Sequence, residues 1–125
     1  MSVLIALVLV GHALMHVGAV SCGLLFSSTP PWIVTGAGLD LGLVTSSAVV
    51  LTSLTVAGYL LAALAAAGVA VPRAWWRPLV VVASIASAVL LAGLFSPAAV
   101  PGLVLDAIFV WAVLGRSWQP ASAGL

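Results

Sequence analysis

Long runs of apolar residues, separated by short polar or proline-containing stretches, dominate the pattern of this chain. A transmembrane helix needs roughly 20 consecutive apolar residues to cross the hydrocarbon core of a bilayer. We predict four such helices, at residues 3–26, 41–71, 79–95 and 98–115, followed by a tail at residues 116–125. The pattern therefore predicts an all-α protein, a four-helix transmembrane bundle that forms one membrane domain over residues 1–125.

Proline marks the connections between the predicted helices. Pro30 and Pro31 follow the first apolar run, Pro72 and Pro78 enclose the turn after the second, and Pro97 follows the third. Proline has no backbone N–H, and it disfavours helical geometry in the residue before it. We therefore expect the helices to end near these positions.

Composition supports a membrane environment. Hydrophobic residues make up 65% of the chain and charged residues only 4%, whereas soluble domains carry about 25% charged residues. The formal charge of +1 argues against a nucleic-acid-binding surface. A single cysteine, Cys22, excludes an internal disulfide and a multi-thiolate metal site within one chain. We expect the lipid bilayer to be the main surrounding of this chain.

The three basic residues predict the orientation. With four spans, Arg73, Arg77 and Arg116 all lie on the side that also holds the N-terminus. Because positively charged residues favour the cytoplasmic side, we expect both termini in the cytoplasm and a multi-pass protein of a bacterial plasma (inner) membrane.

Tryptophan marks both membrane surfaces. Trp75, Trp76 and Trp118 lie next to the arginines, and Trp32 lies in the first connection, on the opposite side. Tryptophan is enriched at membrane–water interfaces. We expect these rings, together with the arginines, to anchor the bundle at the headgroups.

Three residues inside the predicted spans carry most of the candidate chemistry. His12 and His16 are four residues apart and so share one helix face. Asp106 is the only carboxylate inside a predicted span. His12 lies ten residues beyond Ser2 and Asp106 ten residues before Arg116, so both lie about 15 Å from the cytoplasmic side. We expect the three side chains to form one buried polar layer.

This layer is compatible with several roles. A histidine that donates a hydrogen bond to Asp106 could simply hold the first helix against the fourth. Buried histidine and aspartate are also typical of proton relays in membranes. Two histidines and a carboxylate could ligate zinc or copper. Haem with two histidine ligands from one chain is excluded, because both imidazoles lie on the same face of one helix.

Small and hydroxyl side chains form a secondary polar stripe on the second and third predicted helices, namely Thr52, Thr55, Tyr59, Ser84 and Ser87. Such a stripe suits contact with other helices better than contact with lipid, and its hydroxyls often bond to carbonyls of their own helix. Gly11 and Gly18 predict a second close-contact face on the first helix. Asp40 precedes the second helix, where it suits capping.

The segment from Gly11 to Gly18, with its two histidines, resembles the first helix of a group of small, uncharacterised bacterial four-span membrane proteins. Trp32 and the basic turn at residues 73–77 also fit that group. Asp106 departs from it, because the group tends to have an amide there. The resemblance implies four spans and no particular activity.

We expect a small accessory or assembly-type membrane component, working with a larger membrane protein or as a homo-oligomer. The alternatives are a proton-coupled transporter of an ion or small molecule and a metal- or cofactor-binding subunit. No phosphate-binding loop or nucleophile elbow points to an enzyme.

Overall fold

The computed structural model describes residues 2–22, 31–94 and 99–115, and all regular elements in these ranges are helical. The longer helices are α1 (Ser2–Val20), α3 (Leu41–Ala67), α4 (Trp76–Gly93) and α5 (Val100–Val110). The shorter elements are α2 (Trp32–Thr35), the 3-10 turn η2 (Arg73–Trp75) and η4 (Trp111–Gly115), a π-helical continuation of α5.

Three helical segments are long and apolar enough to cross a membrane: Val3–Val20, Leu41–Ala67 and Arg73–Gly93. A fourth apolar helix, Val100–Gly115, is shorter. The prediction of an all-α chain with apolar helices of membrane-spanning length is therefore confirmed for the first three segments.

Two helix ends differ from those expected from the sequence. The second helix ends at Ala67, because Gly68 adopts a left-handed conformation (φ 72°) and its N–H bonds back to the carbonyls of Ala65 and Leu64. The third helix begins at Trp76, so Pro78 lies in its first turn. Proline is tolerated there, since the N–H groups of the first turn have no partner within the helix.

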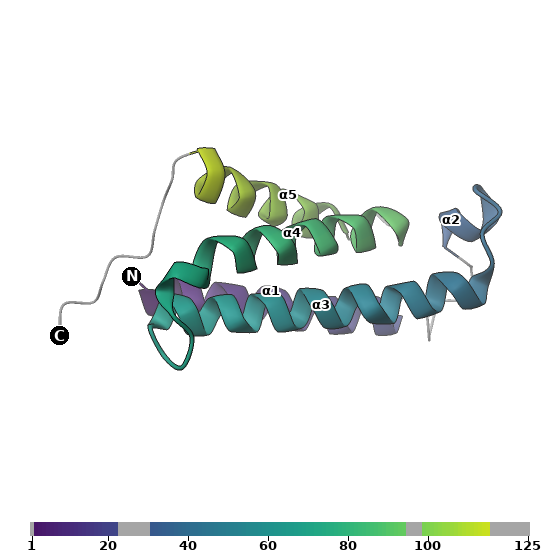
Figure 1. The fold of residues 1–125 in the computed structure, drawn as a ribbon. Helices are drawn as coiled ribbons and strands as arrows, with labels where there is room; N and C mark the ends of the chain where they lie inside the picture. Colours follow the sequence, from purple (N-terminus) through teal and green to yellow (C-terminus); the bar gives the residue numbers. More distant parts are fainter. Residues whose placement is uncertain (1, 23–30, 95–98, 116–125) are drawn as a thin grey trace.

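The helices alternate in direction along the bundle (Figure 1). The contacts run in series, since α1 packs on α3, α3 on α4 and α4 on α5. The start of α1, the end of α3, the start of α4 and the end of η4 lie at the same end of the bundle (Figure 1). This arrangement brings the middle of α1 and the middle of α5, the two segments that carry the candidate site, to the same depth.

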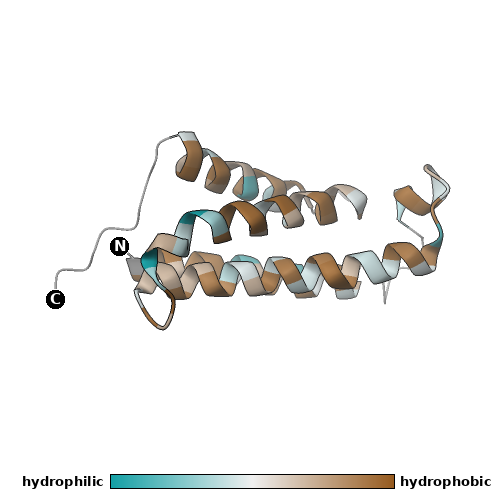
Figure 2. Ribbon diagram, viewed as in Figure 1, coloured by the Kyte–Doolittle hydropathy of each residue, from teal (hydrophilic) through white to brown (hydrophobic). Residues whose placement is uncertain are grey.

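The helices carry the hydrophobic colour over most of their length (Figure 2). Large aliphatic side chains lie exposed on each long helix, for example Leu7, Val50, Ile85 and Ile108. The strongest hydrophilic colour lies at the end of the bundle where α4 begins (Figure 2). Water would solvate such helix faces poorly, so their exposure fits contact with lipid.

Small residues allow α3 and α4 to approach closely. A Cβ atom added to Gly58 would lie 2.8 Å from the Cβ of Ala83. The close-contact face expected on α1 is wrong within this chain, because a Cβ added to Gly11 or Gly18 would meet nothing within 4 Å. The face of α1 that packs inside carries Leu9 and the two histidines instead.

Asp40 occupies the N-cap of α3. Its Oδ1 accepts a hydrogen bond from the backbone N–H of Leu43 at 3.0 Å. The cap satisfies one of the N–H groups that the first turn of a helix leaves without a partner.

Candidate functional site

The two histidines of α1 point into the bundle. The side chains of His12 and His16 are 3% and 2% exposed, and their neighbours on the same face, Leu9 and Ala13, are fully buried. The intervening residues Leu14 and Met15 face outward. The four-residue spacing thus places both imidazoles on the one face of α1 that packs against the other helices.

Asp106 of α5 is 2% exposed and connects α5 to three other helices. Its Oδ1 accepts hydrogen bonds from His12 Nε2 at 3.0 Å and from the Tyr59 hydroxyl at 2.5 Å. Its Oδ2 accepts a short hydrogen bond from the Ser87 hydroxyl. The donors belong to α1, α3 and α4, so this one carboxyl group joins the four long helices.

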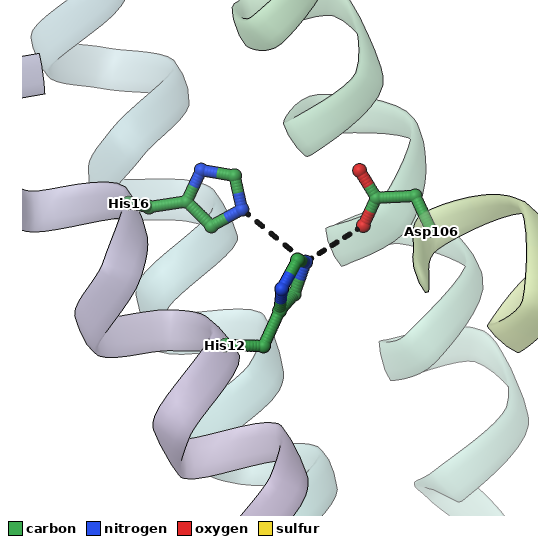
Figure 3. Close-up of side chains that lie close together, drawn as sticks. All are labelled: His12, His16 and Asp106. Atoms are coloured by element: carbon green, nitrogen blue, oxygen red, sulfur yellow. Dashed lines mark hydrogen bonds and ion pairs between the residues drawn. The ribbon is translucent and has the colours of Figure 1, made fainter. Parts of the chain in front are cut away.

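His16 closes the cluster. Its Nε2 lies 2.9 Å from Ser87 Oγ and 3.4 Å from His12 Nε2. Figure 3 shows both rings turned toward the space beside the Asp106 carboxyl group, and the two ring planes are nearly perpendicular (84°). Asp106, His12, His16 and Ser87 therefore form a closed ring of four contacts.

The four contacts of this ring cannot all be full hydrogen bonds, because each imidazole Nε2 carries either one hydrogen or one lone pair. The contacts from His12 to Asp106 (3.0 Å), from His16 to Ser87 (2.9 Å) and from Ser87 to Asp106 are satisfied together when both Nε2 atoms and the Ser87 hydroxyl donate. The longer contact between the two Nε2 atoms, at 3.4 Å, then has no hydrogen bond.

A further hydroxyl extends the cluster along α4. Ser84 Oγ lies 2.9 Å from the Tyr59 hydroxyl, and both residues are buried. Phe109 places its ring 5.9 Å from the rings of His12 and Tyr59, measured between centroids. The polar groups are thus enclosed by aromatic and aliphatic side chains, where each unpaired polar atom is costly.

The sequence placed His12, His16 and Asp106 in one layer, and the structure brings their side chains together. It also brings in Tyr59 and Ser87, which the sequence assigned only to a packing stripe. The signal that could have found them was available, because hydroxyls facing the bundle near the level of a buried carboxyl group are its natural donors. Whether this cluster binds a ligand stays a prediction.

The remaining members of the stripe behave differently. Thr52 is half-buried and donates to the carbonyl of Ala48 in its own helix at 2.6 Å. Thr55 is fully buried, and its hydroxyl has no hydrogen-bond partner among the described residues. Neither residue takes part in the cluster.

The predicted interface anchors divide into exposed and buried residues. Arg73 and Trp75 are exposed in the turn between α3 and α4, and Arg77, in the first turn of α4, is half-buried. Trp76 differs from the expectation, since it is 3% exposed and packs in the core. Trp32 is half-exposed, and its indole N–H donates to the carbonyl of Ala92 at 2.7 Å, which joins α2 to the end of α4.

The other two predicted anchors, Arg116 and Trp118, lie outside the described residues. Among the described residues, the predicted basic anchors are therefore Arg73 and Arg77, between the end of α3 and the first turn of α4.

Three residues of the cluster offer ligand atoms suited to a metal ion. One ligand atom each from His12, His16 and Asp106 lies within 4.8 Å of the other two.

Comparisons of the chain with protein-family models, with curated proteins and with solved structures gave no match. The cluster itself is therefore the main basis for an argument about function.

Proposed function

We propose that this chain is a multi-pass protein of a bacterial plasma membrane, with four spans and both termini in the cytoplasm. The alternating helix directions support the four spans. Arg73 and Arg77 lie at the end of the bundle where α1 begins, which supports a cytoplasmic N-terminus. The fourth helix, Val100–Gly115, rises about 24 Å, less than the roughly 30 Å of hydrocarbon. Local thinning of the bilayer accommodates such a mismatch at modest cost.

Reporter fusions test this topology. A reporter active only in the cytoplasm, fused after Leu125, is expected to be active, and the same reporter inserted at Gly38 is expected to be inactive. Activity at Gly38, or none after Leu125, would contradict the orientation.

Within that membrane we propose that the protein is an accessory or assembly-type component rather than an enzyme. The observation that carries this proposal is the buried network of Asp106, which joins α5 to α1, α3 and α4 by hydrogen bonds. The four residues of the closed ring of contacts, Asp106, His12, His16 and Ser87, are each 3% exposed or less, as expected of groups that fix helix packing. The apolar outer faces of the helices then remain available to a partner in the bilayer.

Extraction in a mild detergent tests the accessory role. The protein at its natural level is expected to migrate in a complex of fixed stoichiometry with a larger membrane protein, or as a homo-oligomer. The variant Asp106→Ala should reduce that complex several-fold, whereas Ser53→Ala should not, because the Ser53 hydroxyl bonds only to Val49 of its own helix in the described structure. A parent protein that migrates as a single chain would overturn the proposal.

Proton-coupled transport is the second candidate. The observation that favours it is the continuous chain of hydrogen bonds from Ser84 through Tyr59, Asp106 and Ser87 to His16, since such chains are typical of proton relays in membranes. In liposomes, a proton gradient should drive flux through the parent protein and not through Asp106→Asn. Equal flux in both would remove this candidate.

A further inference from the structure

The cluster on α1 and α5 combines the features of a metal site. Two imidazole nitrogens, His12 Nε2 and His16 Nε2, and a carboxylate oxygen of Asp106 face one another from two helices. We infer that these three residues bind a divalent transition-metal ion, zinc(II) in the first place. This inference goes beyond the accessory role, and neither depends on the other.

The distances between the ligand atoms support the inference. Zinc binds histidine nitrogen and carboxylate oxygen at about 2.0–2.2 Å, so two ligands of a tetrahedral site lie about 3.3 Å apart. The contact from His12 to His16 is 3.4 Å and that from His12 to Asp106 is 3.0 Å. The third pair lies within 4.8 Å, and a small rotation of the carboxyl group or of the His16 ring would shorten it.

The surroundings supply what a tetrahedral site needs besides its protein ligands. Ser87 Oγ lies 2.9 Å from His16 Nε2 and bonds to Asp106, so it is placed to hydrogen-bond a water or hydroxide in the fourth position. The Tyr59 hydroxyl holds the carboxyl group at 2.5 Å and is held in turn by Ser84. Partners of this kind orient metal ligands and raise the affinity of the site.

The ligand types select the class of metal. Imidazole suits zinc, copper, iron and nickel, whereas magnesium and calcium prefer sets of oxygen ligands. The cluster contains no thiolate, so it offers nothing that favours copper(I). A bound dication with one carboxylate and one hydroxide carries no net charge, which lowers the cost of placing it between apolar helices.

We expect the ion to enter along the seam between α1 and α5. These two helices are not among the pairs that pack extensively, and the cluster side chains span the space between them. Separating the seam locally would expose the ligands without unfolding the α1–α3–α4 packing.

Metal titration of the purified protein tests this inference. The whole chain, freed of any histidine tag and stripped with a chelator, is titrated with cobalt(II) and then with zinc(II). We expect one cobalt per chain, visible bands typical of tetrahedral coordination, and loss of the bands when zinc displaces cobalt. Asp106→Asn and His16→Gln should abolish the bands, and Tyr59→Phe should weaken affinity about 10- to 100-fold. Ser53→Ala is the matched control on α3 and should bind as the parent does.

Two results would overturn the site. One is a folded, monodisperse parent protein that binds no cobalt. The other is binding that persists unchanged in both ligand variants. The detergent-extraction experiment involves no metal, so an intact complex formed by a protein that fails to bind cobalt would refute the metal site alone. Metal binding by an isolated single chain would refute the accessory role alone.

Discussion

Removal of the Tyr59 hydroxyl tests the central claim that the buried network holds α5 on the other helices. The variant Tyr59→Phe keeps the aromatic ring, which is fully buried and packs near His12 and Phe109. It removes only the hydroxyl that donates to Asp106 and contacts Ser84. Packing is therefore nearly unchanged, and the difference in stability reports the hydrogen bonds.

The magnitude follows from the number of bonds lost. Hydrogen bonds between membrane helices contribute about 0.6 kcal/mol on average and up to about 1.7 kcal/mol. Two bonds end on the Tyr59 hydroxyl, so we expect the free energy of unfolding to fall by about 1–3 kcal/mol. Thr55→Val is the matched control one turn earlier on α3, because its buried hydroxyl has no partner among the described residues. Its removal should be neutral or stabilising by up to about 1 kcal/mol.

The measurement is equilibrium unfolding in mixed micelles with increasing dodecyl sulfate, followed by circular dichroism. Both variants are compared with the parent under identical conditions. If the free energy of unfolding of Tyr59→Phe lies within about 0.3 kcal/mol of that of the parent, hydrogen bonding by this hydroxyl does not stabilise the bundle. If Thr55→Val is as destabilising as Tyr59→Phe, the loss of any buried hydroxyl on α3 destabilises the bundle, and the hydrogen-bond partners of Tyr59 are not the cause.

Three other predictions use the same unfolding measurement. Gly58→Ala should lower the free energy of unfolding by about 1–3 kcal/mol, because the added Cβ would lie 2.8 Å from that of Ala83. Gly11→Ala is the control, because its added Cβ meets nothing within 4 Å, and it should leave this free energy unchanged or raise it by up to about 1 kcal/mol. Equal effects of the two would contradict the close approach of α3 and α4. Asp40→Ala should cost about 0.5–2 kcal/mol by removing the N-cap of α3, and Asp40→Asn, which also caps, should cost less. Zinc at about 100 times its dissociation constant should raise the free energy of unfolding by about 2.7 kcal/mol. A chelator should reverse this effect, and Asp106→Asn should not show it. If zinc stabilises that variant as well, the ion binds elsewhere.

Much of the helical architecture could be predicted from hydrophobicity and helix-breaking residues alone. Apolar runs of about 20 residues require helices in lipid, because the backbone has no other way to satisfy its polar groups there. Exact helix ends were less predictable. Gly68 ends α3 through its left-handed backbone, and Pro78 is accommodated inside the first turn of α4. Both depend on local geometry that hydropathy does not record.

The sequence by itself determined that both histidines share one face of α1 and that Asp106 lies at their level along the bundle. The spacing of His12 and His16 defines one helix face, and equal counts from the same side bring Asp106 to their level. Sequence could not decide which face of each helix turns inward. For that reason Gly11 and Gly18 were expected at a contact face, whereas the structure turns them away from the other helices.

Only the tertiary structure decided how the polar groups pair. The rotation of α3 and α4 about their axes, in which Gly58 packs closely against Ala83, places Tyr59 and Ser87 against the Asp106 carboxyl group. Rotation of a helix by one residue would turn a hydroxyl from that carboxyl group to its own backbone or to lipid, as Thr52 shows. Hydropathy specifies that a helix is buried in a membrane, and the contacts between helices specify which of its atoms meet.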